Sequence, residues 1–227
     1  MFKYVSSFLL GIYVIILIPS NLFGHVLGSA ELLQLSKPAL LPVLIVYFLS
    51  VTNGVKSALK LPIVLALSFS WVGDIALMFD TDYPVMFMIG LGGFLIAHIH
   101  YVYVFIKSSN KIKSISKLEW LILPLMFLYT VGLIAVVWPG LGELKIPVFI
   151  YAMVLLSMGV AALIRKQNTG YYWILCGAVL FILSDSILAI NKFYTAMAFS
   201  GLLIMLTYTF AQLFIVLGLS KLIISKR

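Results

Sequence analysis

Eight long apolar runs constrain this chain more than any other feature of its sequence. A helix that crosses a membrane needs about 20 consecutive, mainly apolar residues, and each run is close to that length. We therefore predict an all-α fold, an integral membrane bundle of eight transmembrane helices that forms one domain over residues 1–227. The predicted spans are Tyr4–Phe23, Pro38–Asn53, Leu61–Phe79, Val85–Ile106, Leu118–Trp138, Ile146–Ile164, Tyr171–Ile190 and Tyr194–Ser220.

The composition excludes a soluble globular protein. Charged residues make up 10% of the chain and hydrophobic residues 63%, whereas about 25% of a soluble domain is charged. The single cysteine, Cys176, excludes an intramolecular disulfide. Without a Cys-x-x-Cys motif, an ordinary structural zinc site is disfavoured as well.

Basic residues are distributed unequally between the two sides of the predicted membrane. One side holds twelve of the fifteen: Lys3, Lys56, Lys60, Lys107, Lys111, Lys113, Lys117, Arg165, Lys166, Lys221, Lys226 and Arg227. The other side holds Lys37, Lys145 and Lys192. Because cytoplasmic loops carry the excess of Lys and Arg, we expect both termini in the cytoplasm and, in a bacterium, an inner-membrane location. The net charge of +8 thus reflects topology, and we expect no nucleic-acid partner.

Two aspartates lie inside apolar runs, Asp74 in the third span and Asp185 in the seventh. A charged side chain at the bilayer centre costs about 2.5–3.5 kcal/mol on insertion scales, so such a residue usually has a function. Each Asp precedes the end of an outward-running span by five residues, which places both roughly 7–8 Å below the outer boundary. A parallel duplication of four helices would produce this equal depth, but the shared Asp-x-x-Leu pattern is too common to decide between duplication and coincidence.

The two carboxyls have a structural and a catalytic interpretation. Buried carboxyls can hold a bundle together through hydrogen bonds, for example with Ser70 or Ser184. Two carboxyls at one depth instead favour an acid/base pair, in which one holds a proton while the other stays ionised. We predict that Asp74 and Asp185 face one cavity. Because Asp185 is flanked by Ser184 and Ser186 as local donors, it is expected to be the base and Asp74 the acid.

The fourth span contains two histidines that helical spacing places on different faces. His98 shares its face with Tyr101, whereas His100 points about 200° away. Two histidines at i and i+2 cannot bind one metal from a regular helix, so we expect no catalytic metal and no cofactor. His98 is either a packing residue or a group that orients water or an Asp.

Other polar residues could extend the site. Tyr208 and Gln212 lie one turn apart on the last span, where they either extend a polar cavity inward or form interhelical hydrogen bonds. Lys37 and Pro38 are expected to open the second helix at the outer surface, where Lys37 could reach a lipid phosphate or pair with Asp74.

Taken in order, five short motifs resemble the YhhN-like family of membrane proteins, which includes the lysoplasmalogenases. The motifs are Lys37-Pro38, Gly73-Asp74-x-x-Leu77, Ala97-His98-x-x-Tyr101, Gly177-x-x-x-Phe181-x-x-Ser184-Asp185-x-x-Leu188-Ala189 and Thr207-Tyr208-x-x-Ala211-Gln212. They cover the second to the eighth span.

The resemblance implies an eight-helix hydrolase that cleaves the vinyl-ether bond of a lysoplasmalogen to a fatty aldehyde and glycerophosphocholine or glycerophosphoethanolamine. It implies Asp74 and Asp185 as catalytic residues, with His98 and Tyr208 and, less directly, Lys37 and Gln212 in support. Its partners would be a lysophospholipid substrate and membrane lipid, in an oligomeric state that the sequence leaves open. A lipid or small-molecule transporter, or binding protein, with acidic residues along its pathway is the alternative, and a purely structural role is a third.

Overall fold

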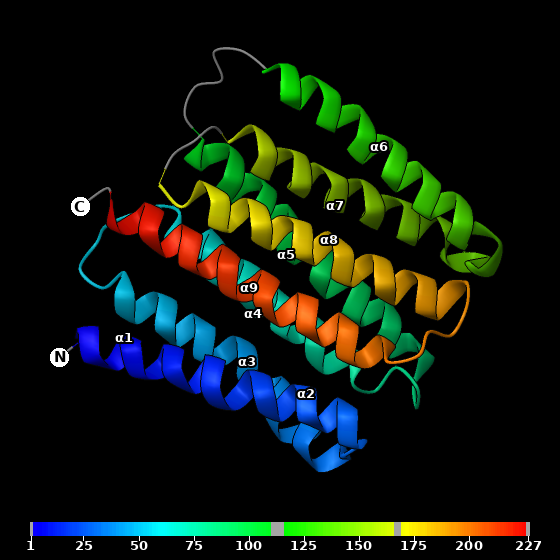
Figure 1. Cartoon of the computed structure of the whole chain (residues 1–227), viewed down its shortest axis with the longest axis horizontal. Helices are drawn as coiled ribbons and strands as arrows, with labels where there is room; N and C mark the ends of the chain where they lie inside the picture. Colours follow the sequence, from blue (N-terminus) through cyan, green and yellow to red (C-terminus); the bar gives the residue numbers. More distant parts are fainter. Residues whose placement is uncertain (1, 110–115, 166–168, 226–227) are drawn as a thin grey trace.

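The structure, a computed structural model, describes residues 2–109, 116–165 and 169–225, and these residues form helices and no strand. Eight of the helical stretches in this part of the chain are long and apolar enough to cross a membrane. The predicted all-α membrane bundle is therefore confirmed. The chain begins and ends at the same end of the bundle (Figure 1), hereafter the termini end. Of the basic residues used to predict orientation, five lie outside the described residues: Lys111, Lys113, Lys166, Lys226 and Arg227.

The first crossing is built from three helical pieces in series. They are α1 (Phe2–Gly11), a π-helical stretch η1 (Ile12–Leu17) and α2 (Ile18–Leu27). In η1, the buried Tyr13 donates a hydrogen bond of 3.0 Å to the backbone carbonyl of Thr209. The π-helical stretch thus directs Tyr13 toward the last helix. Such π-bulges are frequent at functional sites.

Seven further helices follow along the chain. They are α3 (Ala30–Val51), α4 (Lys60–Leu77), α5 (Pro84–Ser108), α6 (Lys117–Val137), α7 (Lys145–Ile164), α8 (Tyr171–Phe193) and α9 (Ser200–Ile224), with two 3₁₀ turns, η2 (Trp138–Gly140) and η3 (Gly142–Leu144), between α6 and α7.

The second crossing begins eight residues before its predicted start, and the expectation that Lys37 and Pro38 open it is wrong. The helix starts after Ser29, whose hydroxyl accepts a hydrogen bond from the Leu32 amide, and Glu31 lies in its first turn. A serine N-cap and an acidic residue in the first turn are both common at the N-terminus of a helix. Pro38 lies inside the helix, which membrane helices tolerate when their surroundings satisfy the freed backbone groups. Lys37 consequently lies about two turns inside α3.

The last crossing begins six residues later than predicted, at Ser200, because α8 continues to Phe193 and a turn follows it. The Asn191 side chain accepts a hydrogen bond of 2.9 Å from the Met197 amide. Phe199 adopts a left-handed backbone conformation with a φ of 58°. Hydropathy does not distinguish this apolar turn from a helix, since both are rich in apolar residues.

Two helix pairs, α4 with α5 and α8 with α9, pack most closely, and glycines make this possible. A Cβ on Gly93 of α5 would lie 2.9 Å from the backbone oxygen of Phe69 in α4. A Cβ on Gly177 of α8 would lie 2.8 Å from the backbone oxygen of Ala211 in α9. Small residues at helix crossings are the usual means of close packing in membranes. Each pair contributes one intramembrane Asp from its first helix.

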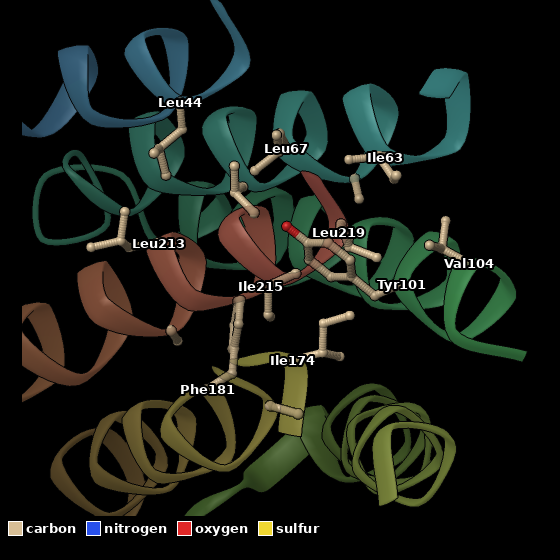
Figure 2. Packing of buried hydrophobic residues seen from close by; sticks show 14 of the residues in the cluster. Leu44, Ile63, Leu67, Tyr101, Val104, Ile174, Phe181, Leu213, Ile215 and Leu219 are labelled. Atoms are coloured by element: carbon tan, nitrogen blue, oxygen red, sulfur yellow. The ribbon is translucent and has the colours of Figure 1, made fainter. Parts of the chain in front are cut away.

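The core of the bundle lies between these pairs and α3. Figure 2 shows the buried side chains Leu44, Leu67 and Phe181 reaching inward from α3, α4 and α8 toward Leu213 and Ile215 of α9. By contrast, α6 lies at the edge of the bundle (Figure 1), and only Glu119 and Val137 of this helix are buried.

Candidate active site

A cavity of about 610 Å³ reaches into the bundle from the end opposite the termini. We call it the site cavity. Its wall is largely apolar, and helices α2 to α9 all contribute to it. The polar and charged side chains that line it are His25, Gln34, Lys37, Asp74, Asp80, Thr81, Tyr151, Ser184, Asp185, Ser186, Asn191, Lys192, Ser200 and Tyr208. The structure therefore brings both intramembrane aspartates to one cavity.

Asp74 of α4 is held by Tyr208 of α9. The carboxyl is 2% exposed, and its Oδ2 accepts a hydrogen bond of 2.6 Å from the Tyr208 hydroxyl. Behind this tyrosine, the side-chain amide of Gln212 donates to the same hydroxyl at 3.4 Å and accepts from Tyr101 of α5 at 2.7 Å. Tyr101 and Gln212 are fully buried and do not line the cavity. They thus hold Tyr208 in place and, through it, Asp74.

Asp185 of α8 has a tyrosine partner of its own. The Tyr151 hydroxyl, from α7, donates a hydrogen bond of 2.6 Å to Asp185 Oδ2. Asp185 keeps more exposure to the cavity than Asp74 does. Tyr151 was not predicted from the sequence, because one tyrosine in an apolar span is as typical of a packing residue as of a functional one. The position of Tyr151 near one end of its span is the sequence signal that could have identified it.

The serines beside Asp185 do not play the predicted part. Ser184 donates to the backbone carbonyl of Ile204 at 3.1 Å, and Ser186 donates to that of Ile182 at 2.7 Å. A serine hydroxyl has one proton to donate. The hydrogen-bond donor to Asp185 that was expected from these serines is therefore Tyr151. Ser186 in turn accepts a hydrogen bond of 2.8 Å from Tyr129 of α6.

His98 lies behind the site and not in the cavity wall. Its ring is fully buried, 4.6 Å from the Phe181 ring and 5.4 Å from the Tyr151 ring, measured between centroids. Within the described part of the chain, neither ring nitrogen has a hydrogen-bond partner. His98 thus packs against the tyrosine that holds Asp185. His100 faces elsewhere, with Nδ1 2.8 Å from the carbonyl oxygen of Ile96.

Three further charged groups line the cavity, namely Lys37, Asp80 and Lys192. Lys192 forms an ion pair with Asp80, with 2.7 Å between Nζ and Oδ2. Lys37 lines the same cavity as Asp74, but no ion pair joins these two described residues. Among the described residues, no three His, Cys, Asp or Glu side chains gather as a metal site would require.

Comparison with known proteins relates this site to a family. The chain is 31% identical over 134 residues to a lysoplasmalogenase of Mycobacterium tuberculosis, covering 58% of this chain and 50% of that protein. It is 32% identical over 154 residues to the lysoplasmalogenase TMEM86B of Homo sapiens, covering 67% of this chain and 61% of that protein. The matched region thus spans only about half to three fifths of the length of these curated relatives.

No solved structure gives a significant match to the chain. Residues 32–219, which include both aspartates and both tyrosine partners, match the YhhN family. The match covers most of the sequence and confirms the resemblance that the motifs indicated. This integral membrane protein belongs to the YhhN family.

Proposed function

We propose that this protein is a lysoplasmalogenase, a hydrolase that cleaves the vinyl-ether bond of a lysoplasmalogen within the membrane. The observation that carries the proposal is the pair of tyrosine-bonded aspartates in one largely apolar cavity. The names of the mycobacterial and human relatives support the same substrate class. The products would be a fatty aldehyde and glycerophosphocholine or glycerophosphoethanolamine.

In the first step, Asp74 gives its proton to the β-carbon of the vinyl ether, which produces an oxocarbenium ion beside two carboxylates. Asp185 then takes a proton from a water molecule as the water oxygen attacks the carbon bonded to the ether oxygen. The result is a hemiacetal. In the last step, Asp185 returns its proton to the leaving glycerol oxygen, while Asp74 takes the proton of the hemiacetal hydroxyl and the aldehyde forms. Both side chains end as they began, and one water is consumed. Inverting glycosidases use a comparable division of roles, in which one carboxyl is the acid and the other activates water, although their acid protonates the leaving oxygen and not a carbon.

The surroundings of the two carboxyls support this assignment of roles. A base that activates water needs access to the cavity, and Asp185 is the more exposed of the two. An acid that protonates carbon benefits from a site that water does not reach freely, and Asp74 is almost completely buried. The tyrosine hydroxyls fix both carboxyls and can stabilise the charge that each carries during the cycle.

The charged side chains that line the cavity suit the polar headgroup of the substrate. Lys37 lines the cavity together with Asp74, and among the described residues its ammonium group forms no ion pair. An ammonium group is a common ligand for phosphate. We assign Lys37 to the headgroup phosphate, with the cavity mouth at the outer leaflet if the positive-inside bias sets the orientation and the termini are cytoplasmic. In a bacterium this would be the inner membrane.

The decisive experiment measures aldehyde release from a synthetic lysoplasmalogen by the purified protein in detergent. Without a sealed membrane or a gradient, a hydrolase turns over and a transporter does not. Asp74→Asn and Asp185→Asn keep the size of the side chain and remove the titrating group, so each should lower turnover by about 100-fold to 10,000-fold. Asp82→Asn, in an exposed turn outside the cavity wall, is the matched control and should retain normal turnover.

Two further substrates define the bond that is cleaved. A saturated ether analogue should be stable, since it has no carbon that accepts a proton, and an ester lysophospholipid should release no fatty acid. In D₂O, the aldehyde, trapped at once by reduction, should carry one deuterium on the carbon next to the former carbonyl. Near-normal turnover in either Asp→Asn variant, or an absence of aldehyde from the folded wild-type protein, would refute the proposal.

A further inference from the structure

A second cavity, of about 420 Å³, lies between α6, α7 and α8. We call it the apolar chamber. It shares four wall residues with the site cavity, namely Leu133, Ala152, Leu155 and Ser186. Ser186 directly follows Asp185 in the sequence. The chamber therefore adjoins the site cavity at the level of a proposed catalytic residue.

The chamber continues from the site cavity toward the termini end along all three helices. On α6, the site cavity is lined by residues 133–137 and the chamber by residues 122–133. On α7 the site cavity ends at Leu155, whereas the chamber extends to Leu163. On α8 the chamber extends back to Leu175. From Leu133 to Ile122 the helix rises roughly 16 Å, so the chamber is an elongated space that runs along the membrane normal.

The wall of the chamber suits a hydrocarbon and not a polar group. Nearly all its side chains are aliphatic, and its three hydroxyls are already engaged. Tyr129 donates to Ser186, Ser186 donates to the backbone of Ile182, and Thr130 donates to the backbone of Met126. No charged side chain lines it in the described part of the chain. An apolar cavity of this kind is suited to bind apolar molecules.

The chamber also opens toward the lipid between α6 and α8. Leu125 of α6 and Val179 and Leu183 of α8 line the chamber, yet they are 54%, 48% and 41% exposed. Since α6 buries so few of its side chains, it covers this side of the chamber only loosely. A chain could therefore enter sideways from the bilayer.

We propose that the apolar chamber holds the single hydrocarbon tail of the substrate and limits the length of tail that the enzyme accepts. The inference rests on the proposed function. A lipid whose phosphate lies near Lys37 and whose vinyl ether lies between the aspartates has its tail directed toward the termini end, where the chamber continues. Gly159, Ile182 and Met126 lie close together in the chamber wall, since a Cβ on Gly159 would lie 2.7 Å from both Ile182 Cδ1 and Met126 Cε.

A matched pair of substitutions on α6 tests the proposal. Leu125→Trp places a large side chain at the chamber wall. Leu128→Trp places the same side chain on the same helix at a lipid-facing position, 66% exposed, that does not line the chamber. With Leu125→Trp, the ratio of kcat/KM for long-tailed over short-tailed lysoplasmalogens should fall about 10-fold to 100-fold, the scale on which a hydrophobic pocket discriminates by size. With Leu128→Trp, the ratio should stay at the wild-type value.

A binding experiment keeps this inference separate from the proposed activity. A saturated ether lysophospholipid with a diazirine at its tail end is photolysed on the wild-type protein, and the labelled residues are mapped by mass spectrometry. Labels should concentrate on the chamber-lining residues of α6, α7 and α8, and unlabelled lysophospholipid should compete while diacyl phospholipid does not. That result supports the chamber as the binding site of the tail, even if no aldehyde is released.

Two outcomes would overturn the inference while leaving the activity in place. One is labelling spread evenly over the lipid-facing helices, or competed equally by diacyl phospholipid. The other is a folded Leu125→Trp protein with an unchanged chain-length ratio, or with equal losses on long and short tails.

Discussion

Replacing Tyr151 by Phe tests the least expected residue of the candidate site. The change removes the hydroxyl that donates to Asp185 at 2.6 Å and keeps the ring that packs against His98. A hydrogen bond to a charged group contributes about 1.5–3 kcal/mol, and about 1.4 kcal/mol corresponds to a tenfold change in rate. Because the bond keeps Asp185 ionised and in position before it takes a proton from water, turnover should fall by roughly 10-fold to 150-fold.

The same substitution in an Asp185→Asn background completes a double-mutant cycle. Once the carboxylate is absent, the hydroxyl has no charge to stabilise, so Tyr151→Phe should lower the residual rate by only about 2-fold to 3-fold. The measurement is aldehyde release from lysoplasmalogen by monodisperse proteins, with thermal unfolding in detergent to show that folding is unchanged. An equal loss in both backgrounds would mean that Tyr151 acts independently of Asp185 and would refute the reasoning.

Three further substitutions probe the site and the bundle around it. In the double variant Asp74→Asn with Asp185→Asn, turnover should fall much less than the product of the two single losses, because the two carboxyls act as one unit. A loss equal to that product would argue against a shared mechanism. His98→Gln should lower turnover by about 10-fold or less, since His98 reaches the site only through Tyr151, and a larger loss in a stable protein would assign it a direct role. Gly93→Ala should lower the free energy of unfolding by about 1–3 kcal/mol, because its Cβ would meet the backbone of α4; an unchanged thermal midpoint would show that the two helices separate at little cost.

The sequence was informative wherever the membrane makes a residue costly. Asp74 and Asp185 could be singled out because a carboxyl inside an apolar run is costly and usually has a function. The counting that predicted their equal depth does not hold, because α4 ends three residues after Asp74 and α8 eight residues after Asp185, although both carboxyls line one cavity. The hydropathy pattern likewise predicted all eight crossings. These deductions depend on single residues and on local sequence, which is why they did not require knowledge of helix packing.

To identify the residues that hold the aspartates, one must know which helices are neighbours, and the sequence says little about this. In lipid, apolar side chains gain almost nothing by facing the protein instead of the bilayer, so periodicity does not show which face of a helix is inside. Tyr151 is buried and Tyr103 is 46% exposed, although both lie in strongly apolar spans. The position of Lys37 inside α3 differs from the prediction because a proline is typical of a helix start, whereas this helix is capped by Ser29 and contains Pro38 in its interior.

The tyrosine partners explain how a membrane bundle can hold two carboxyls without large instability. Each Asp costs about 2.5–3.5 kcal/mol when it is inserted deep in a bilayer, and a hydrogen bond to a charged group returns about 1.5–3 kcal/mol. For Asp185, which is ionised in the proposed resting state, the two values offset each other to within about 2 kcal/mol, and for the protonated Asp74 both values are smaller. Because Tyr208 and Tyr151 come from α9 and α7, this compensation exists only when the helices have assembled. The same contacts that make the aspartates tolerable therefore also fix their carboxyls at the wall of one cavity, and the helix packing that stabilises the bundle positions the groups proposed to perform the chemistry.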